Sequence, residues 1–473
     1  MEAIDSDAYK KAKEAFVSGN NGTTMGEIAL ILSILSTSMW FYNEIMIIVE
    51  RSGVLDGSKL KRTAITFVIE FTVLILPIFI GFTFTEYSLP MTAFFGASAI
   101  ILGVLSWKHA GEDMKKRAIH ERITLLGAKE NAAVTCFRAQ MMVCTVVAIL
   151  AVDFTIFPRR FSKTETFGVS LMDSGVGLFI MSSALTSAYA RGGSNKKTSS
   201  RVSQRAIWGL FRPMIPVLIL GVIRFVTVKK VNYQEHVTEY GVHWNFYITL
   251  ASLYFTYSLL SLFGSIFVSV PAAVVMLAGY QYALSAYGVE EYIFHAPRVD
   301  LFSQNREGIF SLCGYLPLYI LSVAIGQIIF SQSKVGTQMV KSSRWVTATL
   351  LMVCIGSAFA TDLLARHVTP ASRRLLNLPY VGWVLAQGLV VLVTHSLGNN
   401  FSFWPRVPII FNGISRNQLF VFLVANLATG AINLNMRTIY ASPAVGTSVL
   451  LCYLVGVSIF AVALDYFHIK IKL

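Results

Sequence analysis

Long apolar stretches recur along the chain from residue 26 to residue 464, and short polar segments separate them. Each stretch is about as long as the roughly 20 residues that an α-helix needs to cross a bilayer. Because hydrocarbon offers no hydrogen-bonding partner, a segment of this length satisfies its own backbone as a helix. The pattern predicts spans at 26–49, 64–82, 89–107, 133–152, 168–190, 206–228, 246–263, 266–286, 309–330, 343–364, 379–397, 418–434 and 443–464.

The spans predict an all-α membrane protein, a polytopic bundle of about 13 transmembrane helices without a sizeable soluble domain. We expect a polar N-terminal tail at 1–25, one transmembrane domain at 26–464 and a short tail at 465–473. Between the predicted spans 246–263 and 266–286, only Phe263, Gly264 and Ser265 are available for a turn. Two spans are predicted there because a single helix over 246–286 would overshoot the membrane.

Composition agrees with this class, since 55% of residues are hydrophobic and only 14% are charged. The net charge of +14 does not indicate a nucleic-acid partner, because the basic residues lie in short loops. Membrane lipids with anionic headgroups are the expected counter-charge.

Orientation follows from the basic residues, which tend to stay on the cytoplasmic side in short loops. One set of connections carries 22 Lys and Arg residues, and the opposite set, with the N-terminal tail, carries 14. The chain is therefore predicted to have a non-cytoplasmic N-terminus and a cytoplasmic C-terminus. The connections predicted to be cytoplasmic are 50–63, 108–132, 191–205, 331–344 and 398–417.

The connection after the fourth span concentrates charge at the membrane surface. It contains Asp153, Arg159, Arg160, Lys163 and Glu165 among aromatic residues. A carboxylate beside cations suits activation of a hydroxyl, because the carboxylate accepts a proton while a cation neutralises a phosphate or an oxyanion. The alternative is an interfacial belt, in which Arg and Lys reach lipid phosphates and Phe anchors the helix ends.

Two further segments carry polar residues that fit either a site or ordinary helix packing. Asp173 is expected about one and a half turns inside the fifth span, where a buried carboxylate faces a cavity or a partner. Ser170, Ser174 and Gly177 form a small-residue face for close packing. Before the ninth span, Asn305 and Glu307 could cap the helix, and the helix N-terminus with Arg306 could bind a phosphate.

Other polar residues lie within spans. Asn426, Thr429, Gly430 and Asn433 share one face of span 418–434, where they either join helices or line a polar cavity. A structural role is favoured for His395, although membrane-bound O-acyltransferases use an intramembrane His. A wet interior or internal ion pairs are implied by Glu27, Asn43, Glu44, Glu70, Arg138, Arg212 and Arg224.

These motifs together resemble the GPI-anchor inositol acyltransferases, a family called GPI-anchored wall transfer protein in fungi and PIG-W in animals. The resemblance covers nearly the whole chain and is most specific from Asp153 to Gly177. It rests on Val152 to Phe154, Phe157 to Phe161, Lys163 to Glu165, Gly168, Ser170 to Gly177, Asn305 to Gly308, Asn426 to Asn433 and the N-terminal Phe16 to Gly19.

The resemblance implies transfer of a long-chain acyl group, typically palmitoyl, from acyl-CoA to the inositol 2-hydroxyl of glucosaminyl-phosphatidylinositol. It also implies the endoplasmic reticulum membrane, lumenal motif loops, acyl-CoA as co-substrate with no bound cofactor or metal, and Asp153 and Lys163 as the catalytic pair. The residues expected to bind substrate are Arg159, Arg160, Asp173, Asn305, Arg306, Asn426 and Asn433.

Two alternatives stay open. A lipid or solute transporter would also contain intramembrane charges and a polar helix face, although no internal repeat is visible. A non-catalytic membrane subunit of a GPI-synthesis complex would use the same motifs as contact surfaces.

Overall fold

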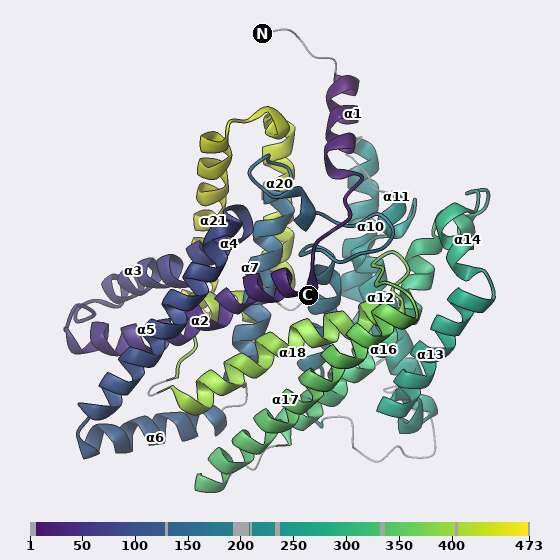
Figure 1. The fold of residues 1–473 in the computed structure, drawn as a ribbon. Coiled ribbons are helices and arrows are strands. Elements are labelled where there is room, and N and C mark those ends of the chain that lie inside the picture. The colour runs from purple at the N-terminus through teal and green to yellow at the C-terminus, as the bar shows by residue number, and fades with distance from the viewer. Residues whose placement is uncertain are drawn as a thin grey trace.

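The computed structural model describes residues 6–127, 131–192, 208, 211–231, 237–331, 336–402 and 405–471. Over these residues the chain is mainly helical, and its one β-bridge joins Thr23 to Val169. The all-α polytopic class is therefore confirmed (Figure 1).

Ten helical segments among the described residues are long and apolar enough to cross a membrane. They are α2 (Met25–Arg51), α3 (Lys59–Glu70) continued by α4 (Leu76–Thr83), α5 (Ser88–Lys108), α7 (Ala132–Ala151), α12 (Phe246–Phe263), α16 (Arg306–Phe330), α17 (Gly336–His367), α18 (Leu378–Phe401), α20 (Gln418–Asn435) and α21 (Pro443–Tyr466).

The remaining predicted spans also coincide with helices, but these are bent or short. α13 (Val270–Ala286) and α14 (Val289–His295) are bent by 70° at their junction and give an eleventh span if counted as one. α8 (Ser174–Leu185) and α10 (Met214–Val231) are shorter apolar helices. Length and composition thus support ten or eleven crossings, and the predicted count of 13 is not confirmed. The turn predicted near Gly264 exists: this glycine has φ +145° and separates α12 from α13.

The fifth predicted span begins six residues too early. Residues 168–173 form an irregular segment, and α8 starts only at Ser174. Gly168 has φ +110°, a conformation that favours glycine and that a helix does not contain. Asp173 consequently lies at the start of α8, in the N-cap position, and not one and a half turns inside a helix.

α7, α8 and α18 pack against one another. α17 packs along α18, and α2 packs along α5 (Figure 1). The predicted small-residue face is confirmed at Gly177. A Cβ atom there would lie 2.6 Å from a Val384 methyl group of α18. Any larger residue at this position would force Val384 or its helix to shift.

Several polar residues inside the spans join helices. The Glu70 carboxylate accepts hydrogen bonds from the Tyr42 hydroxyl and from the first two amides of α19 (Ile409–Arg416). Arg138 donates to Gln418 and Ser415, and His395 Nε2 lies 2.5 Å from Gln140 Oε1. The contact between His395 and Gln140 matches the favoured structural role for His395.

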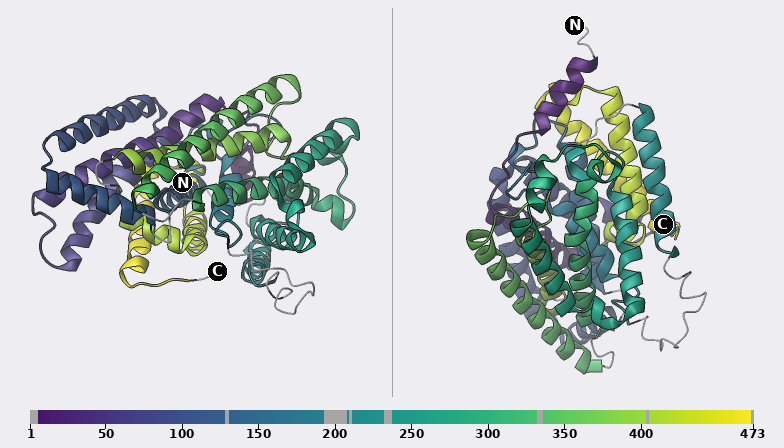
Figure 2. Two further views of the ribbon diagram at one scale, coloured as in Figure 1. Left: turned by 90° about the horizontal axis from the view of Figure 1, so that it is seen from below. Right: turned by 90° about the vertical axis from the view of Figure 1, so that its right-hand side faces the viewer.

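Seven segments meet at one end of the bundle, which we call the α1 face because α1 (Ser6–Val17) projects from it (Figures 1 and 2). They are the N-terminal tail from residue 6 and the connections around 83–88, 153–167, 237–245, 287–308, 365–378 and 435–442. Side-chain contacts link them all: Tyr9 with Tyr440, Lys13 with Asp153, Arg160 with Thr85, Lys163 with Glu239, His243 with Asn305, and Glu307 with Arg374.

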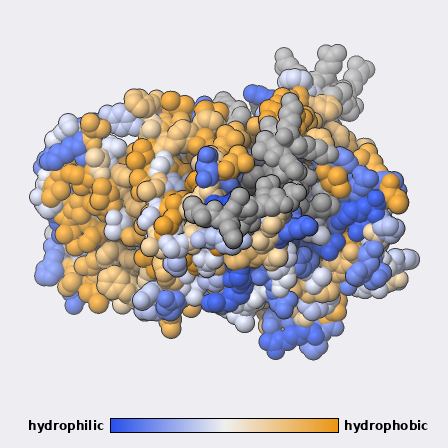
Figure 3. Space-filling model, turned by 90° about the horizontal axis from the view of Figure 1, so that it is seen from above, coloured by the Kyte–Doolittle hydropathy of each residue, from blue (hydrophilic) through white to orange (hydrophobic). Residues whose placement is uncertain are grey.

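The α1 face unites the segments that the charge count assigned to one side. Seen from above, hydrophilic residues gather over its right-hand part (Figure 3). At the other end, Glu50 pairs with Arg406, and Arg416 pairs with Asp465. These residues belong to connections predicted to be cytoplasmic, whereas residues 193–205 of the connection 191–205 lie outside the described residues.

Candidate active site

The connection between α7 and α8, residues 152–173, carries the two candidate catalytic residues and is folded on itself. Phe154, Phe157 and Phe161 are almost fully buried and anchor it in the core. Arg159 donates to the carbonyl oxygens of Val152, Phe154 and Phe157, at 2.9–3.2 Å. This guanidinium therefore satisfies backbone groups that have no helix to bond to.

Arg159 also lies against the N-terminal helix, because its guanidinium carbon is 4.0 Å from the centre of the Phe16 ring. Burial lowers the pKa of Arg159 to about 10, which leaves it charged at neutral pH. Its donors serve the connection in this structure. The predicted contact of Arg159 with a substrate phosphate stays a prediction.

Asp153 is bound by two side chains from distant parts of the chain. Asn433, near the end of α20, donates to Asp153 Oδ2 at 2.7 Å. Lys13 of α1 lies 3.2 Å from Asp153 Oδ1 and donates to Asn433 Oδ1 at 2.9 Å. The three side chains form a closed triangle in which Asp153 and Lys13 are only 12% and 9% exposed. The carboxylate has about four lone-pair positions, so it can accept further hydrogen bonds.

Lys163 faces a carboxylate on the connection between α10 and α12. Its ammonium is 2.6 Å from Glu239 Oε1, on the short helix α11 (Val237–Tyr240). Although burial opposes the charge of Glu239, Lys163 and Arg373 lower its pKa to about 2. The Lys163 side chain remains 35% exposed, so it can reach a bound molecule.

Asp173 holds the backbone next to Lys163 by binding Thr164. Its two carboxylate oxygens accept from the Thr164 amide at 3.1 Å and the Thr164 hydroxyl at 2.9 Å. Arg373, from the connection between α17 and α18, lies 3.0 Å from Asp173 Oδ1 and also donates to the Thr164 carbonyl. Although burial opposes its charge, Asp173 and Glu239 raise the pKa of Arg373. Asp173 thus acts on the site through the backbone next to Lys163.

Arg160 points toward the start of α2. It forms a two-pronged pair with the Glu27 carboxylate and donates to the Thr85 hydroxyl at 3.0 Å. Its side chain is 45% exposed, so a phosphate could approach it.

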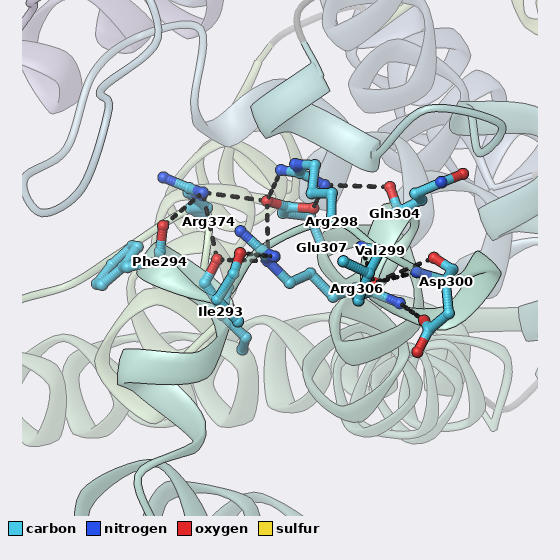
Figure 4. Close-up of polar contacts among 11 residues, drawn as sticks. Ile293, Phe294, Arg298, Val299, Asp300, Gln304, Arg306, Glu307 and Arg374 are labelled. Atoms are coloured by element: carbon cyan, nitrogen blue, oxygen red, sulfur yellow. Dashed lines mark hydrogen bonds and ion pairs between the residues drawn. The ribbon is translucent and has the colours of Figure 1, made fainter.

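A second charged cluster surrounds Glu307, at the start of α16 (Figure 4). Arg298 and Arg374 donate to its carboxylate, at 2.5 Å and 3.0 Å. Arg306 Nε lies 3.7 Å from Glu307 but donates to the carbonyls of Ile293 and Ala296. Three guanidinium groups around one carboxylate leave an excess positive charge. Arg306, however, already donates Nε and Nη1 hydrogen bonds to backbone carbonyls.

Asn305 does not cap α16 through its side chain, so this interpretation was wrong. Its Oδ1 accepts from the His243 amide at 2.8 Å, and its Nδ2 donates to the Leu301 carbonyl. Asn305 therefore joins the connections before α12 and α16. Of the two asparagines predicted on α20, Asn433 contacts Asp153, whereas Asn426 donates to the Phe422 carbonyl of its own helix.

Five charged residues of these clusters were not singled out in the sequence: Lys13, Glu239, Arg298, Arg373 and Arg374. Lys13 and Arg373 were only basic residues in polar segments, and their partners lie 140 and 200 residues away. The adjacent pair Arg373 and Arg374 bridges the two clusters, because Arg373 faces Asp173 while Arg374 faces Glu307.

Comparison with known proteins shows which family this chain resembles. The GWT1 family model matches residues 9–464. The phosphatidylinositol-glycan biosynthesis class W protein of Dictyostelium discoideum is 32% identical over 506 residues, covering 98% of this chain and 99% of that protein. GPI-anchored wall transfer protein 1 of Gibberella zeae is 32% identical over 518 residues, covering 99% and 100%. Its namesake in Yarrowia lipolytica is 36% identical over 372 residues, covering 73% and 74%.

Proposed function

This chain belongs to the GWT1 family and has its role in GPI-anchor biosynthesis, and from this premise we propose that it is an acyl-CoA-dependent inositol acyltransferase. The acyl group, such as palmitoyl, would move from acyl-CoA to the inositol 2-hydroxyl of glucosaminyl-phosphatidylinositol. The proposed location is the endoplasmic reticulum membrane, with the α1 face in the lumen. The observation that carries the proposal is Asp153, a nearly buried carboxylate that Asn433 and Lys13 hold at the start of the Lys163 connection.

The proposed reaction needs an oriented alcohol, a base and stabilisation of one developing negative charge. Asp153 takes the proton of the inositol 2-hydroxyl. At the same time, the oxygen of that hydroxyl forms a bond to the carbonyl carbon of the thioester. Lys163 neutralises the oxyanion of the tetrahedral intermediate or a substrate phosphate. The carbon–sulfur bond then breaks, and the CoA thiolate leaves as the thiol after receiving the proton from Asp153. The products are the inositol ester and free CoA.

The remaining contacts divide between positioning and binding in this proposal. Asn433 and Lys13 orient the Asp153 carboxylate, and Asp173 positions Lys163 through Thr164. Arg160 and the arginines around Glu307 supply the positive charge that CoA or lipid phosphates require.

The transporter alternative draws less support from the structure. Glu70 and Arg138, two of the intramembrane charges that would also fit a transport path, bind backbone amides and polar side chains that join helices. This use of charge is typical of structural contacts between membrane helices.

The deciding experiment uses the purified full chain in lipid nanodiscs, with palmitoyl-CoA and synthetic glucosaminyl-phosphatidylinositol. We expect a lipid product heavier by one palmitoyl group, formed only when both substrates are present. The product should resist a phospholipase that requires a free inositol 2-hydroxyl, which places the new ester on that oxygen. Unchanged lipid would refute catalysis by the purified chain, and movement of unmodified lipid across liposomes would support transport.

A further inference from the structure

α20 and α21 enclose an apolar groove on the outside of the bundle, with a volume of about 620 Å³. Its lining includes Ala428 and Ile432 of α20 and Val449, Cys452, Gly456 and Phe460 of α21. The groove runs along both helices. Over Ser448 to Phe460 it extends for about 18 Å, at the helical rise of about 1.5 Å per residue.

One end of the groove lies beside the Asp153 triangle. Ile432, which lines the groove, directly precedes Asn433, whose amide holds the Asp153 carboxylate. On the other helix, a Cβ atom at Gly446 would lie 3.0 Å from the Phe154 ring, so the start of α21 packs on the residue after Asp153. α20 ends and α21 begins at this point, and the groove leads away from it toward Phe460.

The flanks of the groove are open and apolar. Leu427 and Leu434 of α20 are 65% and 64% exposed, and Val445 and Ile459 of α21 are about half exposed. In a bilayer such a surface faces lipid, so a membrane lipid can enter the groove sideways without leaving the hydrocarbon.

We propose that this groove binds an acyl chain of the acceptor phospholipid, an inference that rests on the proposed function. Asp153 must contact the acceptor hydroxyl to take its proton, and the groove begins at Ile432, next to the Asn433 that holds Asp153. The acceptor carries its phosphate on the inositol carbon next to the reacting hydroxyl. Its glycerol and acyl chains therefore start close to Asp153 and can follow α20 and α21 into the membrane.

In this proposal the groove acts by orienting the acceptor lipid. Lipid tails are as apolar as the groove, so transfer from bilayer to groove yields little hydrophobic free energy. A chain held along the groove instead fixes where the inositol ring lies above it, and a displacement of about 1 Å can cost about 10²-fold in rate.

Gly456 offers a direct test, because it lines the groove, no atom lies within 4 Å of a Cβ atom added there, and a leucine would place its side chain in the groove. Gly279 on α13 is the matched control, since it is equally open and exposed on another helix. Leucine favours a helix over glycine at both positions, so neither variant should lose its fold.

In nanodiscs, we expect Gly456→Leu to lower kcat/KM about tenfold for a long-chain acceptor. A dioctanoyl acceptor, whose chains end before Gly456, should be acylated at nearly the wild-type rate, and Gly279→Leu should match the wild type with both. Equal rates for the two variants with both acceptors would overturn the inference. A defect that instead follows the chain length of the acyl-CoA would assign the groove to the donor and equally overturn it.

A binding measurement separates this inference from the proposed function. A phosphatidylinositol with a photoactivatable acyl chain, in phosphatidylcholine nanodiscs, should label α21 near Cys452, and glucosaminyl-phosphatidylinositol should reduce that labelling. Labelling without turnover in the wild type would refute the acyltransferase and keep the groove as a lipid site. Uniform labelling of exposed helices such as α5 and α17, without competition, would mean ordinary boundary lipid and would refute the groove.

Discussion

Asp153 shows how a single carboxylate depends on parts of the chain that are far apart. Its oxygens meet Lys13 from the N-terminal helix and Asn433 from α20, and all three side chains contact each other. A carboxylate held in this way keeps one orientation, which a general base requires.

Asp153→Asn should therefore abolish most turnover. The amide has the same size and can still contact Lys13, but it cannot take a proton, so we expect kcat to fall by about two to four orders of magnitude. The KM for acyl-CoA should change little, as measured from initial rates across acyl-CoA concentrations. Asp362→Asn, at an exposed aspartate on α17, is the control and should behave as wild type. Turnover within a few-fold of wild type in Asp153→Asn would exclude Asp153 as the base and make His395 the next candidate.

Lys13→Ala should lower kcat about tenfold to a hundredfold, because it leaves Asp153 with one partner and free to turn. The KM for acyl-CoA should stay near the wild-type value, since Lys13 contacts the base and not the donor in this proposal. Lys13→Arg keeps the positive charge and should restore part of the rate. Lys11→Ala, at an exposed position two residues earlier on the same helix, is the matched control. If the two alanine variants were equally active, Lys13 would have no positioning role.

The sequence singles out Asp153 and Lys163 as candidates because both stand in a short, strongly charged connection beside a helix end and match the family motif, and their catalytic roles stay a prediction. It could not predict Lys13, Glu239 or Arg373, since a charge in a polar tail or loop looks the same whether it meets water or a buried carboxylate. Their partners are fixed only when the helices pack.

At the scale of an element, the connection 152–173 is held by side chains where a helix would use its own backbone. In the first half of this connection, Arg159 donates to three backbone carbonyls. In the second half, the Asp173 carboxylate accepts from Thr164. The apolar pattern continues through Val169 and Leu171, which is why the fifth span was predicted to start at residue 168. Hydrophobicity alone does not distinguish a buried irregular segment from a buried helix.

The pair of Lys163 and Glu239 ties this connection to α11 and should make stability depend on pH. The pKa of Glu239 is about 2 in the folded protein and 4.5 ordinarily, so the ionised carboxylate favours the folded state. This contribution, about 3 kcal/mol, is fully present above about pH 5 and is lost as the pH falls toward 2. The melting temperature in detergent, followed by tryptophan fluorescence from pH 7 to pH 3, measures it.

Glu239→Gln should melt at a lower temperature than wild type at pH 7, and the difference should shrink as the pH falls below 5. Glu112→Gln, at an exposed glutamate that pairs with Lys115, is the control and should follow the wild-type curve. A Glu239→Gln curve parallel to wild type over the whole range would show that this ion pair does not contribute to the acid sensitivity.

At the scale of the whole molecule, the basic residues and the packing divide the connections in the same way. The seven segments with fewer Lys and Arg all meet at the α1 face, although nothing in a charge count requires them to touch. Helix positions could be predicted because the bilayer demands long apolar stretches. The number of crossings could not, because α8, α10 and the bent pair α13 and α14 are apolar without being long straight helices.

The division predicts a topology that labelling can test. The α1 face should be lumenal and the end that carries the Glu50–Arg406 pair should be cytoplasmic, because the positive-inside tendency favours the more basic set of connections. In a variant without native cysteines, single cysteines would replace Asp56 at the basic end and Val299 at the α1 face, both exposed. In sealed microsomes, a membrane-impermeant maleimide should label Asp56→Cys directly and Val299→Cys only after the membrane is permeabilised. The reverse pattern would place Asp153 and Lys163 in the cytoplasm, on the side where acyl-CoA is made, and would invert the proposed orientation while leaving the chemistry of the site unchanged.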